Sequence, residues 1–199
     1  NTSNAMEVDW LDTYGVDACM WIGGPGSGCG FRGVADLLTG ASNPSGRLTD
    51  TYATSAMSAP AMMNFGDISY TNGGNYVVYA EDIYVGYRYY ETRYEDAVLG
   101  QGNAASKAGV WASADGWNYA DEVVYPFGYG LSYTTFTQKL DKVEETDGKL
   151  LATVTVTNTG DTAGKSVIEL YAQTPYGDYE KTNLVEKSAI QLVDFDKTK

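Results

Sequence analysis

Residues 16–52 read VDACMWIGGPGSGCGFRGVADLLTGASNPSGRLTDTY, and the pattern of this stretch decides the fold class. Its first seven residues, 16–22, form a short apolar run, which predicts a buried strand. A glycine-rich turn follows at 23–28. Apolar side chains then recur at helical spacing from Phe31 to Leu38, so we expect a strand, a turn and a helix in succession.

The rest of this stretch predicts a second strand. Gly40 stands where a helix C-cap is expected, because glycine adopts the left-handed conformation there without steric cost. The residues NPSG at 43–46 have the composition of a turn, and 47–52 has the pattern of another short strand. Strand, turn, helix, turn and strand together make an α/β unit, and we expect residues 7–136 to form part of a three-layer α/β sandwich.

The middle of the chain is predicted to contain loops around one aromatic strand. Residues 53–80 show no sustained period and are expected to be long loops packed on a surface. Alternation over 83–90 predicts a strand with neither face in solvent. Residues 96–120 are expected to form an insertion loop, and the proline and glycines within 123–136 indicate a structured turn or linker.

Residues 137–199 have the pattern of an all-β domain. Alternation over 151–158 and 167–172, around a short polar link, predicts a hairpin, and another strand is expected over 189–195. The spacing suits an immunoglobulin-like sandwich, which needs about seven strands in about 100 residues, so this segment is only part of one. All four arginines precede residue 137 and eight of the nine lysines follow it, which places a domain boundary there.

The composition excludes several classes of function. The chain has 199 residues, a formal net charge of −13 and no histidine. A Ser–His–Asp triad, a Cys–His pair and a histidine zinc site all need an imidazole, and nucleic acids or anionic membranes need clustered cations. We expect no cofactor and no metal, and no apolar run approaches the ~20 residues that span a bilayer. Cys19 and Cys29 are expected to be buried free thiols, with a disulfide as the alternative in an oxidising compartment.

The two ends of the chain give further expectations. Residues 1–6 are interpreted as a tag remnant followed by a start methionine. They have neither a basic nor an apolar signal-peptide region, which favours the cytoplasm slightly. The alternating strand pattern near residue 195 suggests that the chain is a piece of something larger.

A G-x-G-x-x-G pattern at 28–33 admits two interpretations. It lies between a predicted strand and a predicted helix, and Asp50 follows at about the distance of a ribose-binding acid, which favours a dinucleotide site. The alternative is a strand-to-helix turn that needs small residues for close packing. Glycine is abundant in this chain and these glycines begin far from the strand, so we favour the packing interpretation.

Paired carboxylates and aromatic side chains are the features relevant to sugar chemistry. Glycoside hydrolysis needs two carboxyl groups that face one bond, about 5 to 9.5 Å apart. Spacing alone cannot place two acids across a cleft, and Glu81 is expected to form a structural ion pair or capping contact with Arg88. The tyrosines and tryptophans either stack on sugar rings or fill the core, and the core is favoured. The candidate acids are Asp17, Asp36, Glu81, Asp82 and Glu91.

Several motifs, in order along the chain, resemble glycoside hydrolase family 3, the β-glucosidase-like group. The first is VDACMWIGGPGSG at 16–28, similar to the family's VDA-x-x-x-W strand and glycine-rich turn. The turn often carries an acid in the family, as in PGQEGG, where this chain has Ser27 or Cys29. The others are GVADLLTG at 33–40, NPSGRL at 43–48, YAEDIYVGYRYY at 79–90, YPFGYGLSYTTF at 125–136 and VTNTGD with AGK over 156–165, which resembles the opening of a fibronectin-III-like domain.

The resemblance implies an enzyme that hydrolyses β-linked glucosides or related sugars with retention, by a two-carboxylate double displacement. Family members place the nucleophile on a (β/α)8 barrel, and the acid/base upstream of the VDA strand. No catalytic residue can therefore be assigned in this chain, and the chain alone is expected to be catalytically inactive. Gly24 and Ser27 are the substrate-proximal candidates, because their turn faces the cleft in a complete enzyme.

Other functions remain open at this point. A non-catalytic carbohydrate-binding or scaffold module is the alternative function, because aromatic-rich β domains often hold sugars without chemistry. The partial β-sandwich also leaves strand edges and an apolar face unpaired, so copies of the chain are expected to associate through them. The expected partners are thus a β-linked sugar in the parent enzyme and a second copy of the chain.

Overall fold

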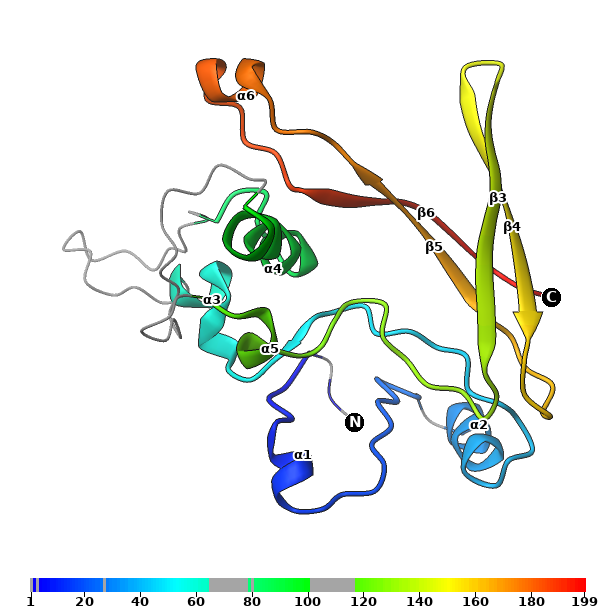
Figure 1. Cartoon of the computed structure of the whole chain (residues 1–199). Coiled ribbons are helices and arrows are strands. Elements are labelled where there is room, and N and C mark those ends of the chain that lie inside the picture. The colour runs from blue at the N-terminus through cyan, green and yellow to red at the C-terminus, as the bar shows by residue number, and fades with distance from the viewer. Residues whose placement is uncertain (1, 3, 27, 65–78, 80, 101–116) are drawn as a thin grey trace. The chain divides into compact units, whose positions relative to one another are not determined.

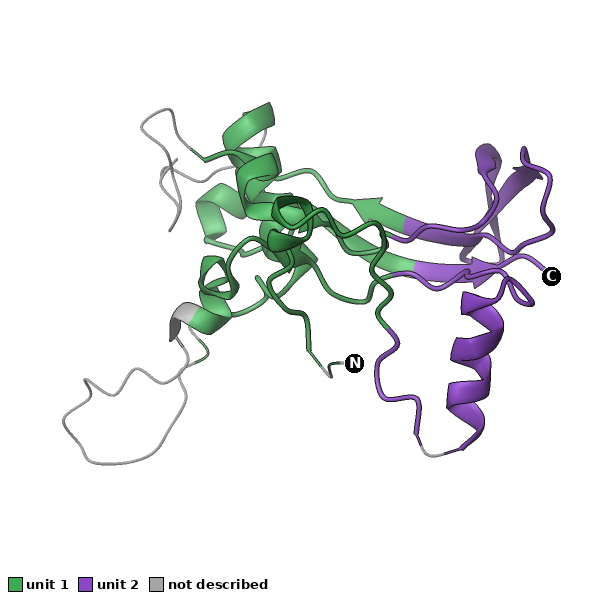
Figure 2. Cartoon of the chain, turned by 90° about the horizontal axis from the view of Figure 1, so that it is seen from below, with its two compact units in different colours: residues 1–21, 48–129, 171–193 green, residues 22–47, 130–170, 194–199 purple. Residues whose placement is uncertain are grey.

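The computed structural model describes residues 2, 4–26, 28–64, 79, 81–100 and 117–199 (Figure 1). Chain contacts divide the molecule into two compact units, which Figure 2 distinguishes by colour. Unit 1 contains residues 1–21, 48–129 and 171–193, and unit 2 contains residues 22–47, 130–170 and 194–199. The predicted domain boundary near residue 137 stays a prediction.

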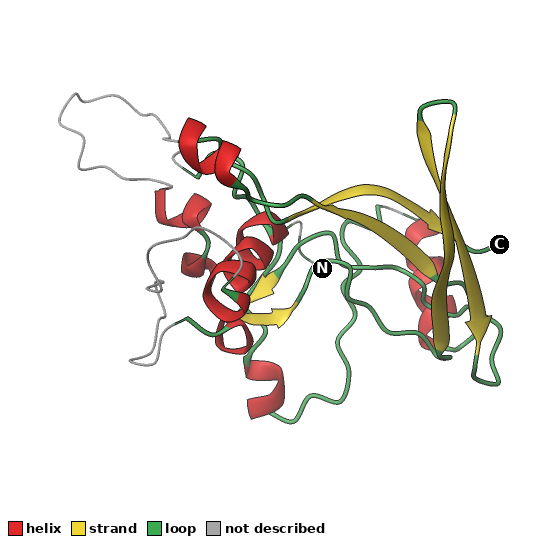
Figure 3. Ribbon diagram, turned by 45° about the horizontal axis from the view of Figure 1, so that its top comes forward, coloured by secondary structure: helices red, strands yellow, loops and turns green. Residues whose placement is uncertain are grey.

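Unit 1 is built from short helices around one small sheet, as the colouring by secondary structure makes visible (Figure 3). Strand β1 pairs antiparallel with β2, so that Tyr52 lies opposite Tyr125 and Ala53 opposite Val123. The elements of unit 1 are α1 (Trp10–Thr13), β1 (Tyr52–Ala53), the 3₁₀ turn η1 (Ala56–Ser58), α3 (Pro60–Asn64), α4 (Tyr87–Tyr94), the π-helical turn η2 (Glu95–Leu99), α5 (Tyr119–Glu122), β2 (Val123–Tyr125) and α6 (Asp178–Asn183).

The core of unit 1 consists of two small apolar clusters on this sheet. In the first, Val8 and Leu11 pack against Tyr52, which brings the N-terminal segment onto β1. In the second, Tyr90 packs with Ala53 and Val123, which holds α4 against both strands. Apolar contacts of this kind provide most of the stability of helices too short to persist alone.

Helix α4 corrects the strand predicted over 83–90. Gly86 has φ 57°, a left-handed conformation that suits glycine, and the helix begins directly after it. Tyr87, Tyr90 and Tyr94 are spaced at i, i+3 and i+7, so the same tyrosines also have helical periodicity. Burial of Tyr90 against the sheet selects the helix, because only that period brings one face of the segment onto the core.

Unit 2 contains helix α2 (Cys29–Leu38) and a long hairpin of β3 (Phe136–Thr146) and β4 (Lys149–Asn158). The predicted helix is confirmed, and Gly40 just beyond its end has φ 76°. Strand β4 was also predicted, but its partner was wrong, because it pairs with β3 and not with residues 167–172. The two strands β5 (Val167–Gln173) and β6 (Ile190–Lys197) form a separate two-stranded sheet whose residues are shared between the units.

The turn between β3 and β4 explains their pairing. Asp147 and Gly148 have φ of 52° and 71°, the left-handed pair required by a tight two-residue hairpin turn. A bulge at Asp141 shifts the register between Leu140 and Lys142. Thr155 donates a hydrogen bond of 2.5 Å to the Asp141 carboxylate, which, together with the Lys139 ammonium at 3.1 Å, lowers the pKa of that carboxyl.

Two further strand predictions fail for lack of a partner. Residues 16–22 have no regular secondary structure, because no described segment pairs with them. Of residues 47–52, only Tyr52 belongs to a strand, although Leu48 exchanges hydrogen bonds of 2.8 Å with Gly128 and Tyr129. The strand predicted over 189–195 is confirmed as β6, and residues 43–46 are irregular coil.

Candidate functional site

The glycine-rich turn before α2 is the predicted substrate-proximal element. Gly24 is exposed, and a Cβ added to it would meet nothing within 4 Å, so a larger side chain would fit there. Ser27 lies outside the described residues. Gly30 is different, because a Cβ there would collide with the carbonyl group of Pro25.

This collision supports the packing interpretation of the G-x-G-x-x-G pattern. Gly30 is needed where the turn folds back on the first residues of α2, which is a steric requirement and not a phosphate contact. A dinucleotide motif also needs a strand directly before its glycines, and the structure has none over residues 16–22.

The five candidate carboxylates differ in their exposure to solvent. Asp17 and Asp82 are exposed, Asp36 and Glu91 are half-buried and Glu81 is buried. No hydrogen bond joins any two of them among the interactions found for the described residues. The predicted Glu81–Arg88 contact is wrong, because the Arg88 guanidinium lies over the Tyr87 ring at 5.6 Å from its centroid. The turn at 81–84 and the start of α4 separate the two residues that one strand would have aligned.

A buried acid that sequence analysis missed lies at the end of α5. Glu122 is 1% exposed, and neither carboxylate oxygen accepts a hydrogen bond within the described part of the chain. Burial raises the pKa of Glu122, and the neighbouring Trp117 indole and Arg93 guanidinium oppose that rise in part. The residue stands in a segment without periodicity, so no local pattern marked it.

The same region contains a second carboxyl group whose pKa is raised, that of Glu91. The Tyr119 hydroxyl donates a hydrogen bond of 2.6 Å to Glu91. Burial raises the pKa of Glu91, and this hydrogen bond lowers it by a smaller amount. On the sheet side of α4, the Tyr90 and Ser58 hydroxyls share a hydrogen bond of 2.7 Å, and both residues are buried.

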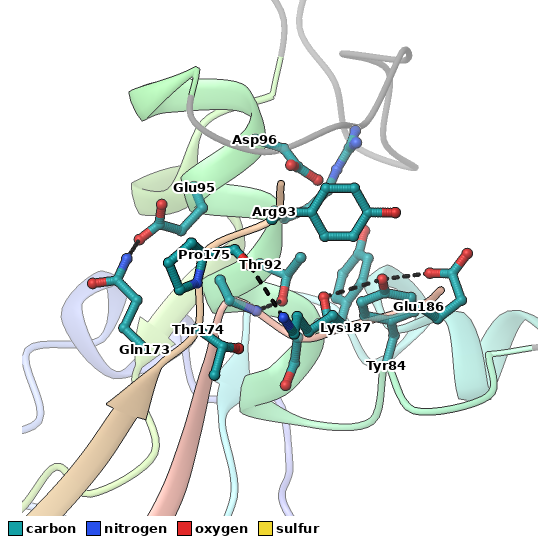
Figure 4. A pocket seen from close by; sticks show the side chains of 14 residues that line it. Tyr84, Thr92, Arg93, Glu95, Asp96, Gln173, Thr174, Pro175, Glu186 and Lys187 are labelled. Atoms are coloured by element: carbon teal, nitrogen blue, oxygen red, sulfur yellow. Dashed lines mark hydrogen bonds between the residues drawn. The ribbon is translucent and has the colours of Figure 1, made fainter. Parts of the chain in front are cut away.

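Unit 1 also contains a cavity of about 650 Å³ (Figure 4). One wall is formed by α4 and η2, which contribute Tyr89, Arg93 and Asp96. The opposite wall comes from residues 173–176 after β5 and residues 186–189 before β6. Tyr84, in the turn before α4, completes the lining.

Hydrogen bonds between these segments fix the rim of the cavity. Gln173 donates to Glu95 at 2.6 Å, and the Tyr84 hydroxyl donates to Glu186 at 2.5 Å (Figure 4). The Thr92 hydroxyl accepts a bond of 2.9 Å from a backbone amide of the opposite wall. Three stretches distant in sequence, residues 84–96, 173–176 and 186–189, are therefore connected to one another around a single space.

Lys187 is held by a carboxylate next to the cavity. Its ammonium lies 2.7 Å from Glu180 and donates to the Pro175 carbonyl at 3.1 Å. The ammonium of Lys187, followed by backbone amides of α6 and Gly177, lowers the pKa of Glu180 to about 2. Glu180 in turn accepts from the amide of Gly177 at 2.8 Å, which caps α6.

No group of three or more histidine, cysteine or acidic side chains in the described part of the chain is arranged to hold a metal ion. None of the helices in the described ranges combines the length and apolarity that crossing a membrane requires. Cys19 and Cys29 are free thiols, but both are exposed, so the prediction that they are buried is wrong.

Comparison with known proteins agrees with the motifs. Residues 1–87 match the glycosyl hydrolase family 3 C-terminal domain. β-Glucosidase B of Emericella nidulans is 37% identical over 178 residues, which cover 86% of this chain and 18% of that protein. A β-glucosidase of Ruminococcus albus is 32% identical over 199 residues, covering all of this chain and 17% of its own length.

Solved structures give the same result for the fold. The β-glucosidase of Paenibacillus barengoltzii superposes with a TM-score of 0.60 at 38% identity, covering 85% of this chain and 15% of that one. β-Glucosidase 3B of Thermotoga neapolitana, solved in complex with glucose, superposes with a TM-score of 0.60 at 35% identity, covering 85% and 19%.

These likenesses define a segment of a glycoside-hydrolysing class of enzyme. The chain belongs to glycoside hydrolase family 3 and is β-glucosidase-like, as its motifs predicted. It spans about a fifth of the length of the curated relatives it matches.

Proposed function

We propose that this chain is a structural part of a retaining β-glucosidase. It would support the catalytic domain without supplying either of the two reacting carboxylates. Residues 7–136 would belong to the α/β sandwich domain, and residues 137–199 would begin a fibronectin-III-like domain. The turn with Gly24 and Ser27 would face the sugar-binding cleft of the complete enzyme.

One observation carries the catalytic part of this proposal. The chain aligns with β-glucosidases over nearly its whole length, yet it covers only 17–18% of the length of these relatives. A double displacement needs two carboxyl groups about 5–5.5 Å apart. Burial raises the pKa values of Glu91 and Glu122, and the Tyr119 hydroxyl is hydrogen-bonded to Glu91.

Release of p-nitrophenol from an aryl β-glucoside tests the proposal. The chain alone should give the rate of the blank, and the same chain extended through its natural reading frame should hydrolyse the substrate with retention at the anomeric carbon. Turnover by the chain alone, abolished by Glu91→Gln, would contradict a structural role.

We further propose that copies of the isolated chain associate through unpaired strands. Each sheet in the described residues has two strands, so every strand has one edge without a partner in its own sheet. The β3–β4 hairpin also carries exposed apolar residues, among them Leu140, Val143 and Leu150. Open edges beside apolar side chains favour pairing with another chain.

A further inference from the structure

We propose that the cavity between α4–η2 and residues 173–189 is a non-catalytic binding site for a neutral pyranose sugar. The site lies wholly within unit 1 and requires no part of a catalytic centre. Its volume of about 650 Å³ is in the range of small-ligand pockets, which is about 300–1,000 Å³. The proposal is independent of hydrolysis, because it concerns binding alone.

The charges that line the cavity favour a neutral ligand. The lining carries two cations, Arg93 and Lys187, together with three carboxylates, those of Glu95, Asp96 and Glu186. A ligand of either charge therefore meets like charges on the lining. A polyol, which offers hydroxyl donors and acceptors without charge, suits both sets of groups.

Three tyrosines of the lining provide the apolar part of such a site. Tyr84, Tyr89 and Tyr176 line the cavity, and all three side chains are half-buried. Aromatic rings pack against the C–H faces of a pyranose, and their hydroxyl groups add hydrogen bonds at the edge. Aromatic walls with a few placed polar groups are typical of small-molecule sites.

Polar groups remain to orient the sugar hydroxyls. Asp96 and Thr174 form no hydrogen bond with another described side chain, and both line the cavity (Figure 4). A carboxylate accepts from two vicinal hydroxyls, and a threonine hydroxyl both donates and accepts. They come from opposite walls, η2 and the segment after β5, so a sugar between them would be held from both sides.

The walls are fixed before a ligand arrives. The Gln173–Glu95, Tyr84–Glu186 and Ala189–Thr92 hydrogen bonds connect the segments across the rim. Behind the α4 wall, the Arg93 guanidinium lies over the Trp117 ring at 6.0 Å and is attracted by the buried Glu122. A site ordered in advance loses less conformational entropy on binding, which raises the affinity for a small ligand.

Isothermal titration calorimetry of the whole chain tests the site with glucose and cellobiose. We expect dissociation constants in the millimolar range, with weaker binding of the cationic analogue glucosamine and of the anionic analogue gluconate. Tyr176→Ala should weaken glucose binding about tenfold, the effect of losing one good contact, and Tyr176→Phe should keep most of it. Tyr179→Ala is the matched control, because Tyr179 is 70% exposed on α6 and outside the lining.

A second variant keeps the proposal testable if Tyr176→Ala fails to fold. Asp96→Asn keeps the size of the side chain but removes its charge, and should weaken binding of both sugars while the circular dichroism spectrum stays unchanged. The proposal is wrong if no neutral sugar binds at millimolar concentration, if Tyr176→Ala binds as the parent chain does, or if a charged analogue binds more tightly. None of these results depends on turnover. A chain that binds glucose without hydrolysing a glucoside therefore supports the proposed binding site.

Discussion

A carboxylate that is 1% exposed and accepts no hydrogen bond from a described residue is unfavourable in its charged form, and Glu122 is in that position. Burial raises its pKa in the folded state above the value near 4.5 of the unfolded chain. The charged form therefore costs folding free energy above the folded-state pKa. This cost is relieved as the pH falls through that pKa towards the unfolded value.

We expect Glu122→Gln to raise the melting temperature at pH 7, because glutamine keeps the shape of the neutral acid. Glutamine leaves the same buried positions polar, so only the cost of burying the charge is removed, and a gain of about 1 kcal/mol is expected. The gain should shrink as the pH is lowered towards 5. Asp121→Asn is the control, since Asp121 is the exposed neighbour on α5.

The measurement is thermal unfolding by circular dichroism between pH 5 and pH 8. A lower melting temperature for Glu122→Gln across that range would mean that the attraction of Arg93 outweighs desolvation. At the residue scale, sequence analysis identified none of this, because burial of Glu122 depends on contacts between α4, α5 and the sheet. The pattern around residue 122 is that of a polar loop.

At the scale of the elements, two glycines of unit 2 have opposite conformational requirements. Gly148 has φ 71° in the β3–β4 turn, and Gly33 lies within helix α2. A Cβ at either position would meet nothing within 4 Å, so alanine there changes backbone preference and not packing. Alanine substitutions at Gly148 and Gly33 therefore measure the effect of backbone conformation on stability, separately from packing.

We expect Gly148→Ala to lower the free energy of unfolding by about 1 kcal/mol, because a left-handed conformation is strained for any residue with a Cβ. Gly33→Ala should raise it by about 0.5–1 kcal/mol, because alanine is the better helix former. Urea unfolding followed by circular dichroism measures both. Equal effects of the two substitutions would show that the turn does not hold the conformation found here.

The elements differ in how far the sequence could predict them. Helix α2 was predictable because its apolar spacing, its glycine beyond the C-terminus and its environment all agree. Strand β3 was not predicted, although the Asp147-Gly148 dipeptide is a strong hairpin signal. Alternation in β4 and β5 suggested that these strands pair, but alternation reports which face is buried and not which strand is adjacent.

The aromatic segment over 83–90 shows a different limit. Its tyrosines fit periods of both two and 3.6, and the contact of Tyr90 with Ala53 and Val123 decides between them. The cavity could not be predicted for the same reason. Its walls combine residues 84–96, 173–176 and 186–189, which no local pattern relates to one another.

At the scale of the whole molecule, ordered motifs identified the family more reliably than any single element identified the fold. Each motif is weak alone, but their order along one chain is unlikely to arise by chance, and the family match over residues 1–87 agrees with the first four. Local misassignments of 16–22 and 83–90 did not affect this result. The order of the motifs is a property of the sequence alone, so it is unaffected when a helix is predicted as a strand.

The hairpin of unit 2 leads to the prediction at this largest scale. On one face of β3–β4, Leu140 lies opposite Val154 and Val143 opposite Ala152, and Val143 is 52% exposed. On the other face, Thr153 lies opposite Lys142. One apolar face and two open edges should bring copies of the chain together at tens of micromolar, which light scattering detects as a mass above that of the monomer.

A charge on the apolar face should reverse this association. We expect Val143→Lys to weaken self-association about tenfold or more, because a lysine on that face must be desolvated in any sheet-to-sheet or edge contact. Thr153→Lys adds the same charge to the polar face and should change the association little. A monomeric mass for the unmodified chain, or equal effects of the two lysines, would mean that the apolar face of the hairpin does not drive contact between copies.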